Sequence, residues 1–370
     1  MTLADQAPGS KARIAGFDGV RGICVLLVFF EHFIHSGNDV GGLGVKMFFA
    51  LSGYLIVGIL HSQRLRIESN KTTVIREIKT FWTNRIVRIF PVYYLTLFAL
   101  LLFFVIKGRG LNYQGLGYYF FFLGNFHIQN ISHSWGQFTH LWSLSVEQHF
   151  YMLMSVVIIF IPAFMHRWAL LTFLGIASAF EIYAWTIWDL VDKPYVSDVP
   201  GFVYMAAGGA IALWPKNFSY RLFAKICGYC FVAACLLWAA INFGHFLKEG
   251  GAKVGLLQIL SLIGCCCVLV YLPQRQGSIL TKLLEFQPLA YLGKISYGFY
   301  IYHYFFHFAA QAAKVSFIPS PYGSILLVFA QFVFTCAVAA VSWELFEKRM
   351  LLFKRRSVTP VALNRDAVQS

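Results

Sequence analysis

The chain has 370 residues, of which 58% are hydrophobic and 12% charged, with a formal net charge of +14 at pH 7. A water-soluble core of this length cannot hide that much apolar surface, so composition indicates a membrane protein. The apolar residues come in segments of about twenty, the length that an α-helix needs to cross a bilayer. The sequence therefore predicts an all-α, polytopic helical bundle rather than a β-barrel.

We expect about ten of these apolar segments to cross the membrane as helices. They lie at residues 22–37, 43–61, 89–106, 142–164, 168–188, 200–214, 222–243, 253–272, 294–313 and 323–346. The polar start of the chain feeds directly into the first apolar run without a small-residue cleavage site, so this helix is expected to be retained. A further segment at 113–128 is short, aromatic and interrupted by glycine. It is predicted to be a re-entrant or interfacial element.

The charged residues sort between alternate loops. Lys and Arg gather in loops at 62–88, 215–225 and 273–294 and in the tail, whereas Asp39, Asp189, Asp192, Asp198 and Glu249 fall in the other loops. Basic loops face the cytoplasm in membrane proteins. We therefore predict a multi-pass protein of the cytoplasmic (inner) membrane with both termini in the cytoplasm. With no internal repeat or long linker, 1–370 is predicted to form one domain, with 1–14 and 357–370 as flexible cytoplasmic tails.

Two other classes of function are disfavoured. The basic residues sort by membrane side rather than along one helix with interleaved aromatics, so no nucleic-acid partner is expected. The eight cysteines all lie inside predicted spans. Three of them, at 265–267, are consecutive, and consecutive helical residues point about 100° apart and cannot share a metal. We expect buried free thiols and no metal site.

The first predicted span carries ionisable residues in an otherwise apolar run. Arg21 precedes His32 by eleven residues, which brings both to one helix face about 16 Å apart along the axis. His35 lies on nearly the same face, so geometry alone does not choose between the two histidines. Glu31 is the neighbour of His32, but adjacent helical residues point apart. A carboxylate from another helix is therefore the better candidate to orient the imidazole.

Two more groups of polar residues stand at predicted span boundaries. Arg85 and Arg88 are one turn apart where the third span begins, and paired guanidiniums bind phosphate well. Ordinary positive-inside charge or anionic lipid contact is the alternative. Glu147 follows in the fourth span, at a depth similar to that of His32. Its carboxylate could set the tautomer of an imidazole or serve as a structural anchor.

Five sequence blocks carry a family resemblance. In order, they are FDGVRGICVLLVFFEHF, GVKMFFALSGYLIVGIL, NRIVRIFPVYYL, HLWSLSVEQHFYML and ISYGFYIYHYFF. Their order and spacing resemble the acyltransferase-3 family of integral membrane acyltransferases over residues 15 to about 310. The resemblance implies transfer of an acyl group, usually acetyl, from cytoplasmic acyl-CoA to a hydroxyl of a cell-envelope polysaccharide or glycoconjugate. Acetyl-CoA is the implied co-substrate, a glycan or glycolipid the implied acceptor, and membrane lipid the surrounding partner.

The resemblance also implies roles for individual residues. Catalysis would fall to His32 and Glu147, coenzyme A binding to Arg21, Arg85 and Arg88, and substrate binding to Trp142, Ser143, Ser145 and His303. His32 would act as general base or carry the acyl group itself.

The chain departs from the family pattern in a few places. Lys46 stands where an acidic residue is frequent, Tyr302 where Trp is common, and no proline follows His303. We expect a stand-alone membrane domain without an appended esterase-like domain.

Alternative functions remain open at the level of sequence. Within the enzyme class, the acceptor could be a small hydrophobic alcohol such as a macrolide or a lipid, and the donor succinyl-CoA. A proton-coupled exporter of a small anion would also need buried Glu and His and basic loops, but it would move substrate without consuming thioester. A structural or lipid-binding subunit is a third reading. The sequence does not indicate the length of the acyl group, the position of the acceptor hydroxyl or the oligomeric state.

Overall fold

The computed structural model describes residues 14–34, 39–106, 115–133, 138–187, 196–214, 220–244, 250–312 and 322–350. These residues form helices joined by turns, and no strand occurs among them. The prediction of an all-α membrane bundle is confirmed.

Every predicted span contains a helix within the described ranges. The ten helices are α1 (Phe17–Phe33), α2 (Val40–Glu68), α3 (Val74–Ile106), α6 (Trp142–Phe160), α7 (His166–Ile187), α8 (Asp198–Ala212), α9 (Tyr220–Phe243), α10 (Gly251–Gln274), α13 (Ser296–Ala312) and α14 (Tyr322–Ser342). Seven helices of the described part are long and apolar enough to cross a membrane. Helices α1, α8 and α13 have only 17, 15 and 17 residues. The count of ten crossings stays a prediction.

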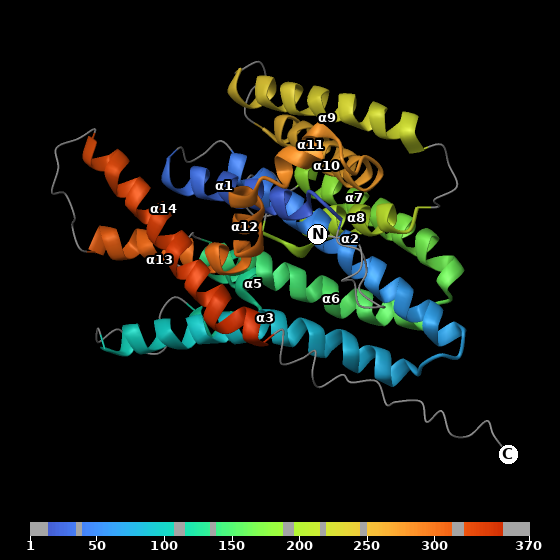
Figure 1. The fold of residues 1–370 in the computed structure, drawn as a ribbon, viewed down its shortest axis with the longest axis horizontal. Helices are drawn as coiled ribbons and strands as arrows, with labels where there is room; N and C mark the ends of the chain where they lie inside the picture. Colours follow the sequence, from blue (N-terminus) through green and yellow to red (C-terminus); the bar gives the residue numbers. More distant parts are fainter. Residues whose placement is uncertain are drawn as a thin grey trace.

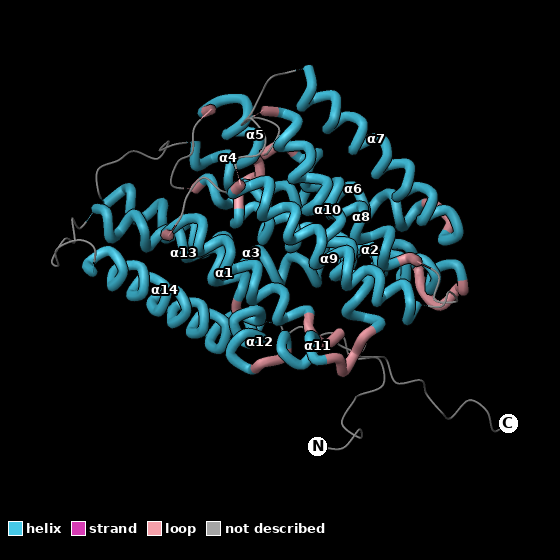
Figure 2. The backbone as a smooth tube through the Cα atoms, turned by 90° about the horizontal axis from the view of Figure 1, so that it is seen from above, coloured by secondary structure: helices cyan, strands magenta, loops and turns pink. Residues whose placement is uncertain are grey.

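Shorter elements lie at the two ends of the bundle. Helices α4 (Leu116–Phe120) and α5 (Gly124–His127) continue into a π-helical turn, Ile128–Ser132. The longest helix within 115–133 has five residues, too short to cross a bilayer. Helices α11 (Ile279–Leu284) and α12 (Gln287–Lys294) lie at the opposite end, where α1 begins (Figure 2). Single turns at Thr139–Leu141, Ala163–Met165 and Trp343–Glu347 complete the described elements.

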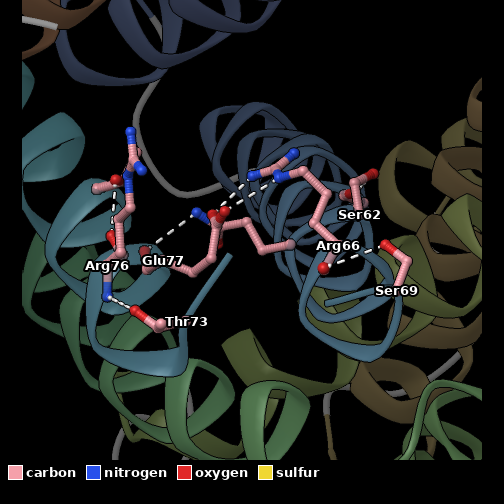
Figure 3. A network of polar contacts seen from close by, with 9 residues as sticks. Ser62, Arg66, Ser69, Thr73, Arg76 and Glu77 are labelled. Atoms are coloured by element: carbon pink, nitrogen blue, oxygen red, sulfur yellow. Dashed lines mark hydrogen bonds and ion pairs between the residues drawn. The ribbon is translucent and has the colours of Figure 1, made fainter. Parts of the chain in front are cut away.

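The expected loop at 62–88 is wrong. Helix α2 runs on to Glu68 and α3 begins at Val74, so most of the basic residues of this region lie on helices. Arg66 donates from Nε and Nη2 to the two carboxylate oxygens of Glu77, at 3.0 and 2.6 Å, and ties the helix ends together (Figure 3). Charged composition predicted a loop here, but a two-pronged ion pair between the helices stabilises both extensions.

Helix α2 occupies the middle of the bundle. It contacts α1, α3, α6, α8 and α10, and Figure 1 shows it passing between them. Its closest neighbour is α8, where glycines remove the side chains between two backbones. A Cβ atom at Gly53 would overlap the carbonyl oxygen of Met205, and one at Gly208 would overlap that of Ala50. Small residues at such contacts are typical of membrane helices. This contact anchors the helix on which part of the site is built.

Candidate active site

A cavity of about 120 Å³ lies between α1, α2, α3, α6 and α13, and we call it the arginine cleft. Arg21 reaches it from α1, Arg85 and Arg88 from α3, and Ser143 and Glu147 from α6. The i, i+3 and i, i+4 spacings of these pairs place each pair on one helix face. Five of the nine residues that sequence analysis proposed for the site therefore line one cavity.

The charges of the arginine cleft favour an anionic ligand. Arg21 donates to the carboxylate of Asp18 at 2.8 Å. Arg85 Nε is buried and has no hydrogen-bond partner among the described residues. A buried guanidinium nitrogen without an acceptor costs free energy, which a phosphate oxygen would recover. These residues therefore fit the phosphates of an acyl-CoA.

A second cavity of about 340 Å³ continues from the same arginines. It shares Arg21, Arg88 and Tyr297 with the cleft and lies between α12 and the turn Trp343–Glu347 that follows α14. Lys294 adds a third cation to its wall, whereas Asp18 and Glu347 add carboxylates. The arginines thus stand where two cavities meet, near the end of the bundle that carries α12.

Glu147 is held inside the cleft by two hydroxyl groups. Ser52 donates to Oε1 at 2.5 Å, and Tyr151, one turn further along α6, donates to Oε2 at 3.2 Å. Neither hydrogen bond joins Glu147 to His32, so an orienting role of this carboxylate stays a prediction. Glu147 instead places its carboxyl group beside the arginines.

The imidazole partner of His32 is His303 from α13. His32 Nδ1 and His303 Nε2 are 2.8 Å apart, and the two rings stack with their centroids 5.0 Å apart. His303 Nδ1 lies 2.6 Å from the carbonyl oxygen of Tyr300. A carbonyl only accepts, so His303 Nδ1 carries a proton. His303 is 0% exposed, and burial favours its neutral form. Its Nε2 then accepts from His32 Nδ1.

A chain of hydroxyl contacts connects the cleft to this histidine pair. Tyr300 donates to the carbonyl oxygen of His140 at 2.6 Å, so Ser143, 2.8 Å away, must donate to Tyr300. The His140 ring lies 5.3 Å from that of His303, and we call His32, His140 and His303 the histidine cluster. Ser143 and Tyr300 line the cleft, but none of the three histidines does. The Tyr300 side chain, which lines the cavity, therefore lies between the cavity and the histidine cluster.

The other two predicted site residues, Trp142 and Ser145, make contacts that stabilise the fold. Trp142 is buried with its ring edge-on to Phe49, 5.9 Å between centroids. Ser145 is fully buried and accepts from the backbone N–H of Gly124 at 3.2 Å, which fixes α5.

The sequence analysis also named Glu31, Lys46 and His35, and the structure describes the contacts of the first two. Glu31 accepts from the backbone N–H of Val40 at 3.1 Å and so caps the start of α2. Buried Lys46 donates to Asp39 at 2.6 Å. His35 lies outside the described residues.

Comparison with known proteins identifies the family. The model of the acyltransferase-3 family, described as an acyltransferase domain, matches residues 14–344, and the chain belongs to this family. A Bacillus subtilis (strain 168) protein provisionally named peptidoglycan O-acetyltransferase YrhL is 28% identical over 90% of this chain and 54% of its own length. The peptidoglycan O-acetyltransferase OatA of Listeria monocytogenes is 27% identical over 80% of this chain and 49% of its own.

A third relative, the O-acetyltransferase OatA of Staphylococcus aureus (strain NCTC 8325), is 25% identical over 80% of this chain and 51% of its own length. The chain thus spans about half the length of these curated relatives. No solved structure matches it.

Sequence reasoning missed four side chains that the structure adds to the site. Ser52 and Tyr151 hold Glu147, Tyr300 closes the cleft, and His140 joins the histidine cluster. Tyr151 was within reach of the sequence, because it follows Glu147 by four residues on a predicted helix. The other three come from contacts between helices and left no local signal.

Proposed function

We propose that the protein is a membrane O-acetyltransferase. It would move an acetyl group from cytoplasmic acetyl-CoA to a hydroxyl of a cell-envelope polysaccharide, with peptidoglycan the first polymer to test because the relatives are named for it. The observation that carries the proposal is the cation-rich cleft that contains Arg21, Arg85 and Arg88 and ends beside the histidine cluster. Family membership supports the acyl transfer.

The donor would enter from the end of the bundle that carries α11 and α12. Arg85 and Arg88 would bind phosphates of coenzyme A, and Arg21 would exchange Asp18 for a phosphate oxygen. The positive-inside rule assigns this end to the cytoplasm, because basic residues of α2, α3 and α11 to α12 gather there. The thioester would then pass the layer formed by Ser143 and Tyr300 to reach His32, so this layer must move during the reaction.

The chemistry would use the lone pair on His32 Nε2. This nitrogen would take the proton of the acceptor hydroxyl as the oxygen attacks the thioester carbonyl. The carbon–sulfur bond then breaks, and the imidazolium returns its proton to the leaving coenzyme A thiolate. The products are an ester, free coenzyme A and neutral His32. The partly buried position of His32 among helices would limit the access of water that competes with the acceptor.

His303 would act as a positioning residue. It accepts from His32 Nδ1 and donates to a backbone carbonyl, so it selects the His32 tautomer that presents Nε2 as the base. Glu147 would balance the charge of the arginines in the donor cleft rather than touch the imidazole.

The experiment that tests the proposal uses the purified full chain in detergent with radiolabelled acetyl-CoA and soluble peptidoglycan fragments. We expect free coenzyme A and alkali-labile acetyl ester in equal amounts. Absence of acetyl-CoA binding and turnover, also with succinyl-CoA, would remove the enzyme proposal. Turnover with a hydrophobic alcohol but no glycan would keep the donor site and replace the acceptor.

A further inference from the structure

A third cavity opens on another side of the bundle, between α1, α9, α10 and α11. Its volume is about 720 Å³, and we call it the lateral groove. Figure 1 shows α9 stacked over α10, with α11 beside it. The groove uses its own face of α1: Val20, Ile23, Cys24 and Leu27 form an i, i+3, i+4, i+7 stripe. Arg21 follows Val20 directly and points about 100° away, into the arginine cleft.

The lateral groove has a mostly apolar wall and positively charged residues at one end. Aliphatic, aromatic and cysteine side chains form most of its described wall, and that wall contains no Asp or Glu. Its two charged residues are Lys225, in the second turn of α9, and Arg275, directly after α10. Both lie at the same end, because α9 begins where α10 ends. An apolar channel with cations at one end matches an amphiphile with an anionic head.

Two further observations point to a lipid. Arg275 Nε is buried and has no hydrogen-bond partner among the described residues, so the groove contains an unmet donor. The wall extends along α9 from Lys225 to Trp238, thirteen residues or about 20 Å of helix. One leaflet contributes about 15 Å of hydrocarbon. The groove therefore has the reach of one lipid chain below a headgroup at the membrane surface.

We propose that the lateral groove binds an anionic glycerophospholipid. Arg275 and Lys225 bind its headgroup phosphate, and one acyl chain lies against α1 and α10 among residues such as Cys24, Leu260 and Cys265. The bound lipid fills a gap that α9 and α10 leave beside α1. This site is separate from the arginine cleft and does not depend on acyl transfer.

The test measures lipid binding to the purified full chain by native mass spectrometry. Phosphatidylglycerol and phosphatidylcholine with identical acyl chains are titrated in the same detergent. We expect saturable binding of one phosphatidylglycerol in preference to phosphatidylcholine. Each neutralising variant, Lys225→Gln and Arg275→Gln, should weaken it about fivefold, because a basic residue at the membrane surface contributes about 1 kcal/mol toward an anionic lipid. Arg275→Lys should restore most of the affinity.

A pair of glycine variants separates the groove from general lipid contact. A Cβ at Gly264 on the groove wall would lie 3.9 Å from the Phe231 ring, so Gly264→Leu fills the groove without a backbone clash. Gly255 on the same helix has no atom within 4 Å of its Cβ position and is not on the wall, so Gly255→Leu is the matched control.

Loss of phosphatidylglycerol binding in Gly264→Leu alone supports the proposal. Equal binding in both variants, or no preference between the two lipids, overturns it. Displacement of the lipid by glycerol phosphate alone also overturns it, because the site then reads free phosphate rather than a lipid.

Discussion

Replacement of His303 by phenylalanine tests how the histidine cluster works. His303→Phe keeps a planar ring in a fully buried position but removes the acceptor for His32 Nδ1, 2.8 Å away. A buried donor without a partner costs about 1–3 kcal/mol, which His32 would avoid by moving its proton to Nε2. The reactive tautomer would then be depleted about 10- to 100-fold, and kcat should fall by the same factor.

The readouts separate a positioning role from a structural one. KM for acetyl-CoA should stay within about twofold, because the arginine cleft does not include His303. His303→Gln retains an acceptor oxygen and should recover part of the lost kcat. The assay is coenzyme A release, resolved by chromatography so that the cysteines of the protein do not interfere.

The chain offers a matched control in a second histidine pair, in which His166 is fully buried, as His303 is in the first. His61 Nδ1 and His166 Nδ1 are 2.9 Å apart, and His166 Nε2 lies 3.1 Å from the carbonyl oxygen of Ile161. His166→Phe should therefore cost similar stability with an unchanged kcat. A kcat of His303→Phe within threefold of the parent, or equal losses in the Phe and Gln variants, would refute the tautomer argument.

The other predictions address donor binding, the base and sidedness. Arg85→Gln should weaken acetyl-CoA binding about 10- to 100-fold by calorimetry, since hydrogen bonds to charged groups contribute about 1.5–3 kcal/mol; an unchanged affinity would leave this arginine a topology signal. His32→Ala should abolish turnover while acetyl-CoA still binds, and loss of both would mean that the two sites are not separable. Glu147→Gln should tighten acetyl-CoA binding, because a negative charge leaves a cation-rich cleft; weaker binding would show that the carboxylate positions the arginines. With the labelling of the parent protein as background, Asn130→Cys should react with an impermeant thiol reagent applied from outside, and Ser69→Cys should resist it. Labelling of Ser69→Cys but not of Asn130→Cys would invert the topology.

Local periodicity predicted the parts of the site that lie within one helix. The eleven-residue step from Arg21 to His32 and the three-residue step from Arg85 to Arg88 each place two side chains on a common face. The cleft contains Arg21, Arg85 and Arg88 together, and these are the residues to which the family resemblance assigns coenzyme A binding. Hydropathy likewise located a helix in each expected span, because apolar length is a property of the segment itself.

Contacts between distant segments were beyond the reach of periodicity. His32 and His303 are separated by 271 positions, and nothing local to either residue indicates the pairing. The sequence therefore favoured Glu147 as the carboxylate that orients His32. In the structure, this carboxylate accepts hydrogen bonds from Ser52 and Tyr151. The loop expected at 62–88 failed for a related reason, because charge density alone does not reveal an ion pair that joins two helices.

The most direct test of acyl transfer across the membrane uses inverted vesicles, whose outer surface is the cytoplasmic face. Radiolabelled acetyl-CoA is added outside, with an acceptor glycan enclosed in the lumen, and both free coenzyme A and labelled glycan ester are followed over time. With the parent protein, we expect coenzyme A to appear outside and ester inside in equal amounts, and His32→Ala should yield neither. Accumulation of label inside without release of coenzyme A, or ester formation by His32→Ala at the parent rate, would contradict acyl transfer at this histidine.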